Sequence, residues 1–157
     1  PNIFYKATLL SAAIMVIIAL TSIFNRILTL MQVPQDIANY ASSITTSPIL
    51  FLLLVNLVCF IVGMFMETNA AVLLMAPLLY PAAMSFGIDP IHFGIVLVTN
   101  IQIGLITPPM ATNLFVSAKI NKSSIQEMLP HLFKFLIPSI ILLLIITYVP
   151  ALSLWWQ

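Results

Sequence analysis

The residues best suited to chemistry in this sequence lie where an apolar helix must stop, at a Thr-Pro-Pro run over residues 107–109. Proline has no backbone N–H, so the carbonyls of Gly104 and Leu105 would lose their helical donors. Proline also disfavours the α conformation in the residue before it. A helix arriving here should end near Ile106, and a new one should start near Pro109, because proline suits a first helical position. Such a break offers carbonyls to a cation and a helix N-terminus to an anion.

The polar residues that lead into the break share one helical face. Asn100, Gly104 and Thr107 are spaced i, i+4 and i+7. Small and amide residues of this kind also line plain helix–helix contacts in membranes, so packing is the alternative interpretation. A hard cation without its water prefers several oxygen ligands. The carbonyls of Gly104 and Leu105 and the hydroxyl of Thr107 would suit Na⁺.

Glu67 is the carboxylate that lies between two long apolar runs. An ionisable group at membrane depth is a functional hypothesis by default. Glu67 could balance the charge of a cation or fasten a hairpin tip. If both apolar runs cross the membrane completely, Glu67 simply lies in a cytoplasmic turn.

The composition predicts an integral membrane protein whose partner is the lipid bilayer. The chain has 157 residues, of which 62% are hydrophobic and 6% charged, with a net charge of +1. Soluble domains carry about 25% charged residues. There is no basic patch for nucleic acid, and no catalytic triad, carboxylate pair or metal-binding motif, so we expect no nucleic-acid partner and no enzyme activity.

The chain divides into four segments, all expected to be α-helical. They are a transmembrane helix with a surface arm (1–47), a helical hairpin (48–86), a broken transmembrane helix (87–122) and a final transmembrane helix (123–157). Within the last segment, a turn starting at Ser123 or Ser124 precedes the span from Phe133 to Val149. The Gly87-Ile-Asp89-Pro90 run predicts a helix end followed by an N-cap and a new helix.

The hairpin allows two interpretations. It could be two full crossings joined by a tight turn, or a re-entrant hairpin whose small and polar tip covers residues 63–71. Thr68 or Asn69 would be a good N-cap for its second arm. Either interpretation puts the same lysines on one side, namely Lys6, Lys119, Lys122 and Lys134. The positive-inside rule makes that side cytoplasmic and the C-terminus periplasmic.

Four blocks carry a resemblance to a known family: Gly63-Met-Phe-Met-Glu67, Pro77-x3-Pro81, Gly87-Ile-Asp-Pro-Ile-His-Phe-Gly94 and Gly104-x2-Thr107-Pro-Pro-x4-Leu114-Phe115. With them the chain resembles the C-terminal portion of the large membrane subunit of TRAP transporters (DctM-like). It departs from the family in having Glu67 where Asp is common, and Met110-Ala111 where a glycine commonly follows the prolines.

The resemblance implies a Na⁺-coupled importer of an organic anion, a dicarboxylate or a sugar acid such as sialic acid, in the bacterial inner membrane. The fold would be half of an inverted-repeat, elevator-type transporter, with the re-entrant hairpin meeting the broken helix. The first helix and the final span would be partly scaffold or arm. The implied partners are the missing N-terminal half of the subunit, a small TRAP membrane subunit and a periplasmic substrate-binding protein.

Two sets of site residues follow from the resemblance. The expected Na⁺ ligands are Gly63, Glu67, Thr68, Asn69, Gly104, Leu105 and Thr107. The expected substrate-binding residues are Asn100, Thr107, Pro108, Pro109, Thr112 and Asn113. The alternatives are an elevator-type anion transporter that needs no binding protein, and a membrane scaffold subunit that transports nothing.

Overall fold

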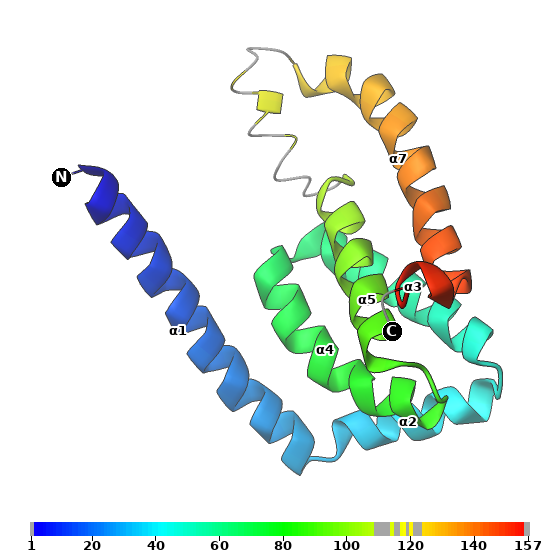
Figure 1. Ribbon diagram of the computed structural model, residues 1–157. Coiled ribbons are helices and arrows are strands. Elements are labelled where there is room, and N and C mark those ends of the chain that lie inside the picture. Colours follow the sequence, from blue (N-terminus) through cyan, green and yellow to red (C-terminus); the bar gives the residue numbers. More distant parts are fainter. Residues whose placement is uncertain (1, 109–113, 115–116, 119, 121–123, 156–157) are drawn as a thin grey trace.

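The computed structural model describes residues 2–108, 114, 117, 118, 120 and 124–155. All regular structure in these residues is helical, and four of their helices (α1, α3, α4 and α7) are long and apolar enough to cross a membrane. The chain is therefore an all-α membrane protein, as expected. Its elements are α1 (Asn2–Leu30), α2 (Val33–Ile44), α3 (Pro48–Phe65), α4 (Thr68–Ser85), α5 (Pro90–Leu105), α7 (Ile125–Tyr148) and a 3-10 turn, η1 (Pro150–Leu152) (Figure 1).

The turn between α4 and α5 follows the local sequence. Gly87 has φ 69°, a left-handed conformation that glycine adopts without steric cost. Asp89 then caps α5, because its carboxylate accepts the backbone N–H groups of Ile91 (2.8 Å) and His92 (3.2 Å). Pro90 is the first helical residue. The predicted stop and restart is confirmed.

The start of α7 also follows from its sequence. The Ser124 hydroxyl accepts the Glu127 N–H, and the Glu127 carboxylate accepts the Ser124 N–H, which makes a reciprocal capping box. The sequence predicted a turn from Ser123 or Ser124 through Glu127 and a span that begins at Phe133. In the structure one helix begins at Ile125 and continues through Pro130 and Pro138 to Tyr148.

The core is formed where α3, α4 and α5 meet, with α2 packed beneath them (Figure 1). Several residues of α4 at this core are alanines, and their small side chains allow the helices to approach closely. At one end of the core the rings of Phe51 and Phe86 stack at a centroid distance of 4.5 Å. The buried core residues are Phe51, Leu52, Val55, Cys59, Ala71, Met75, Leu79, Ala82, Ala83, Ile88, Phe93, Leu97 and Ile101.

The two ends of the described chain attach differently to this core. α7 packs on α5 through Leu136 and Leu143, and the Ser153 hydroxyl beyond it lies 3.1 Å from the Nδ1 atom of the buried His92. In contrast, α1 extends away from the bundle and runs into α2 through a sharp corner (Figure 1). No residue in the apolar window of α1 is buried.

Candidate functional site

The tip of the α3–α4 hairpin and the end of α5 touch through two glycines. A Cβ atom added to Gly63 would lie 2.7 Å from the Ile101 carbonyl oxygen, and one added to Gly104 would lie 2.8 Å from the Gly63 Cα. Only glycine allows two helix backbones to come this close. The structure thus brings together Gly63 and Gly104, two of the predicted Na⁺ ligands, at the last turn of each helix.

The helix break lies where the prolines predict it. α5 ends at Leu105 with Ile106 as its cap. Because Pro108 has no N–H, the Gly104 carbonyl was expected to have no donor. In the structure it accepts the Thr107 N–H at 2.9 Å. This expectation was wrong, because a tight turn returns an N–H that the proline cannot supply.

Thr107 is buried directly after the end of α5. Its hydroxyl donates to the Ile103 carbonyl at 2.8 Å, which commits the proton and leaves the oxygen lone pairs available as an acceptor. Leu105 stands four residues before Pro109, which has no N–H to donate to it. The other predicted residues beyond the break, Pro109, Thr112 and Asn113, lie outside the described residues.

Glu67 caps α4. Its Oε2 atom accepts the backbone N–H groups of Asn69 (3.0 Å) and Ala70 (3.3 Å), and its Oε1 atom accepts the Asn69 side-chain amide (2.9 Å). The prediction of Thr68 or Asn69 as the N-cap was wrong, because the helix begins at Thr68 and the residue before it supplies the cap. The carboxylate thereby links residues 67–70 at the hairpin tip. Fastening the tip was one of the two roles considered for Glu67.

A cavity of about 680 Å³ lies beside the hairpin tip, between α1, α4 and α5. Its polar wall consists of Glu67, Thr68 and Asn69 from the tip and Gln102 from α5. The Thr68 hydroxyl is buried and has no hydrogen-bond partner among the described residues. Sequence reasoning missed Gln102, although an amide in an apolar helix, two residues after Asn100, is a signal that could have identified it.

Asn100 lies away from that cavity, on the face of α5 that contacts α3. Its side-chain amide donates to the carbonyl (2.8 Å) and the Oδ1 atom (2.9 Å) of Asn56, and Asn56 in turn donates to the Thr147 hydroxyl of α7 (3.0 Å). Asn100 is fully buried, and its own Oδ1 atom has no partner among the described residues. The structure therefore joins Asn100 directly to α3 and, through Asn56, to α7, and does not bring it to the predicted tip residues.

Within the described residues, no three His, Cys, Asp or Glu side chains group as metal ligands. The groups near the break that could hold a cation are backbone carbonyls and the Thr107 hydroxyl, which are the oxygen ligands that hard cations prefer.

Comparison with known proteins gives matches over nearly the whole chain. The family described as "Tripartite ATP-independent periplasmic transporter, DctM component" matches residues 1–152. A C4-dicarboxylate TRAP transporter large permease protein of Pseudomonas aeruginosa is 42% identical over 98% of this chain. An isethionate TRAP transporter permease protein of Oleidesulfovibrio alaskensis is 37% identical over 93%, and a sialic acid TRAP transporter large permease protein of Vibrio cholerae is 33% identical over 95%. The chain spans 36%, 23% and 35% of the length of these three relatives.

Proposed function

This chain belongs to the DctM family of tripartite ATP-independent periplasmic transporters, and we propose that it is the C-terminal part of a permease subunit that imports an organic anion together with Na⁺. Membership in a family of bacterial inner-membrane transporters agrees with its apolar helices and argues against an enzymatic role. Because the chain spans about a third of its large-permease relatives, the remaining part of the subunit is the first partner of the proposal.

The observation that carries the proposal is the backbone contact between Gly63 and Gly104. It joins a hairpin tip to a helix break, and discontinuous helices of this kind form the ion and substrate sites of many secondary transporters. The Na⁺ ligands of the proposal are the Thr107 hydroxyl oxygen, the carbonyls of Gly104 and Leu105, and groups of the tip. The Thr107 hydroxyl suits this role because its proton is already donated to Ile103.

The charge at the tip supports coupling between the anion and a cation. The N-terminus of α4, at the wall of the tip cavity, would attract an anionic group. The Glu67 carboxylate already accepts two N–H groups in the first turn of α4. Because it is itself negatively charged, it would repel an anionic substrate at short range. A Na⁺ ion at the neighbouring break would offset that repulsion, so the anion would bind better once the ion is present.

The hairpin is proposed to be re-entrant and to move with α5 as an elevator. α3 and α4 have 18 residues each, or about 27 Å, which is near the lower limit for a crossing, whereas the 29 residues of α1 measure about 43 Å. The bond between Asn56 and Thr147 supports placing α7 with the moving part, which leaves α1 as the described helix best suited to the scaffold. A cysteine introduced by Asn69→Cys should resist an impermeant thiol reagent from the cytoplasmic side, whereas Lys6→Cys should react. Ready labelling of both would contradict the re-entrant hairpin.

The substrate and the other partners are proposed from the relatives. The names of the relatives include C4-dicarboxylate, isethionate and sialic acid, and the most similar of the three relatives compared above is a C4-dicarboxylate permease. We therefore propose a C4-dicarboxylate as the first anion to test. A periplasmic binding protein would deliver it, and a small membrane subunit would complete the assembly.

The experiment is uptake by the complete permease in proteoliposomes, measured against Na⁺ concentration with the binding protein present. Thr107→Val keeps the shape of the residue and removes one oxygen. A charge-assisted contact is worth roughly 1.5–3 kcal/mol, so the apparent Na⁺ affinity should fall about tenfold to a hundredfold. At saturating Na⁺ the substrate affinity should change less, because the ion can still fill the site.

Thr99→Val is the matched control, since it removes a hydroxyl from α5 away from the break. It should leave the Na⁺ dependence unchanged. If Thr107→Val also leaves the Na⁺ dependence unchanged, the hydroxyl is not a ligand. Uptake that needs no Na⁺ at all would overturn the coupling.

A further inference from the structure

One side-chain hydrogen bond links α1 to the hairpin in the described part of the chain. The Asn25 side-chain amide donates to the Leu73 carbonyl of α4 at 2.7 Å. Pro77 stands four residues after Leu73 and has no N–H, so this carbonyl has lost its helical donor. Asn25 therefore binds an acceptor that a proline created.

A second proline repeats the same chemistry one turn further along α4. Pro81 stands four residues after Pro77, so the Pro77 carbonyl has also lost its helical donor. Four residues advance a helix by about 5.4–6 Å and turn it by about 40° beyond one full turn. The two released carbonyls therefore lie one above the other on nearly the same side of α4.

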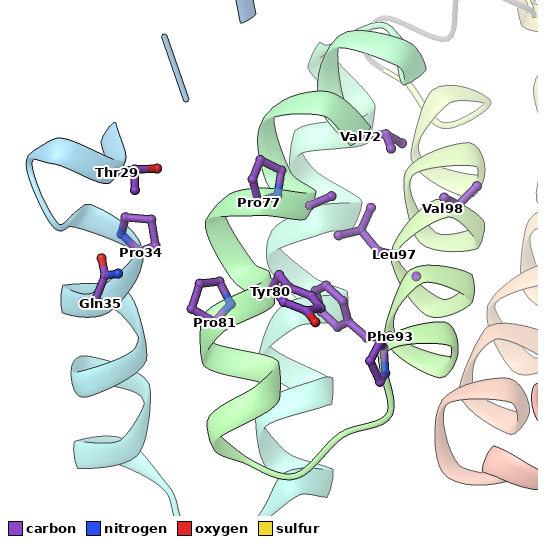
Figure 2. A pocket seen from close by; sticks show the side chains of 13 residues that line it. Thr29, Pro34, Gln35, Val72, Pro77, Tyr80, Pro81, Phe93, Leu97 and Val98 are labelled. Atoms are coloured by element: carbon purple, nitrogen blue, oxygen red, sulfur yellow. The ribbon is translucent and has the colours of Figure 1, made fainter. Parts of the chain in front are cut away.

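The C-terminal part of α1 contacts α4 at the first of these carbonyls, and the two helices run in the same direction (Figure 1). Asn25 lies level with Leu73, and Thr29, one turn later, lines the same cavity as Pro77. This cavity has a volume of about 530 Å³ and lies between the α1–α2 corner, α4 and α5 (Figure 2). Thr29 cannot donate its hydroxyl across the cavity, because that proton goes to the Asn25 carbonyl at 2.8 Å.

Within the described residues, α1 makes no other side-chain hydrogen bond to a neighbouring helix. In the described part of the chain no residue of the apolar window of α1 is buried, and the hydrogen bonds of the Thr8, Ser22 and Thr29 side chains stay within α1. The corner to α2 turns on Gln32, which has φ 58°, a conformation that residues other than glycine seldom adopt. A cavity and a strained corner thus lie next to the Pro77 carbonyl, which has lost its helical donor.

We propose that α1 docks on α4 in two registers one helical turn apart, with Asn25 donating to the Leu73 carbonyl in one and to the Pro77 carbonyl in the other. Asn25 is then a positioning residue that sets where α1 stands against the hairpin. The positions are discrete because an amide without a partner is costly in a bilayer, and each register gives the Asn25 amide an acceptor. One-turn shifts between packed elements are known in switching proteins.

Disulfide cross-linking in the complete permease measures the register directly. Thr21 of α1 lies beside the same cavity as Ala70 and Leu74, which are one turn apart on α4. In the present register residue 21 is level with residues 69–70, and after a one-turn shift it would be level with 73–74. The pairs Thr21→Cys with Ala70→Cys and Thr21→Cys with Leu74→Cys therefore report the two registers, after Cys59 and any other native cysteines are replaced.

The two prolines provide matched variants with opposite expected results. Pro77→Ala restores an N–H that recaptures the Leu73 carbonyl, so the 21–74 cross-link should increase relative to 21–70. Pro81→Ala recaptures the Pro77 carbonyl instead, so the same ratio should decrease. The loss of one interhelical hydrogen bond in a membrane predicts a change of about threefold in each direction.

The outcomes separate a register shift from a general effect of straightening α4. Both variants remove a kink from the same helix, so a general effect would move the ratio in the same direction in both. In an Asn25→Ala background the two variants should give equal ratios. Shifts in the same direction, or a difference that persists without Asn25, would overturn the proposal. Because the readout is cross-linking and not uptake, either result leaves the Na⁺ proposal untouched.

Discussion

The contact between α3 and α5 and the contact between α1 and α4 are built in opposite ways. In the first contact, two backbones touch at Gly63 and Gly104, and the Asn100 amide donates two hydrogen bonds to Asn56. In the second, Asn25 makes one hydrogen bond and a cavity of about 530 Å³ lies one turn further on. Lipid is as apolar as the helices, so close packing and hydrogen bonds decide which membrane helices stay together. The first contact is therefore suited to stay fixed and the second to change.

This difference gives the prolines of α4 and those after α5 separate roles. Pro108 ends α5 at a place where the backbone is held against α3 by the glycine contact. Pro77 leaves α4 continuous and releases a carbonyl on the side of α1. The same chemical property, a missing N–H, thus forms a fixed break in one place and an adjustable contact in the other.

The largest effect is expected from Gly104→Ala, which would break the fixed contact. The added methyl would lie 2.8 Å from the Gly63 Cα and from the Phe60 carbonyl oxygen, and backbone atoms cannot move away as a side chain can. Overpacking of this kind costs about 1–3 kcal/mol or more. Thermal unfolding of the purified complete permease should show a midpoint lower by several degrees.

Gly94→Ala is the matched control on the same helix, because nothing lies within 4 Å of the added methyl. It should leave the midpoint unchanged or raise it slightly, since alanine favours a helix over glycine. Equal midpoints for the two variants would show that the α3–α5 contact can relax.

A smaller effect is expected from Asn100→Leu, which removes the donor to two acceptors of Asn56. Leaving buried acceptors without a partner costs about 1–3 kcal/mol, although membrane measurements fall toward the lower end. Equilibrium unfolding of Asn100→Leu, Asn56→Leu and the double variant forms a thermodynamic cycle. We expect the double variant to lose less stability than the sum of the single ones, and strict additivity would contradict the network.

The smallest effect on stability is expected from Asn25→Leu. It removes one interhelical hydrogen bond, worth about 0.6 kcal/mol on average in a membrane protein. The unfolding midpoint should therefore stay close to that of the parent permease. Ser22→Ala, which removes a bond inside α1, is its control. A loss as large as that of Gly104→Ala would mean that α1 is fixed to α4 as firmly as α3 is to α5.

The sequence by itself determined the features that depend on neighbouring residues in the chain. Its composition identified an all-α membrane protein, and its prolines predicted the end of α5 near Ile106, which is the residue that caps the helix. Gly87 and Asp89 predicted the turn into α5, and Ser124, which caps α7, was one of two residues predicted to begin a turn there. These features could be predicted because capping, left-handed turns and missing N–H groups act over four residues or fewer.

Only the tertiary structure decided which polar groups meet. Asn25 and Leu73 are 48 residues apart, and Asn56 and Thr147 are 91 apart, so no local pattern pairs them. The choice of Glu67 over Thr68 as the cap of α4 also depended on where the hairpin turns, next to the contact of Gly63 with α5. In a sequence with so few polar residues, each one can be recognised as important, but its partner depends on how the helices pack.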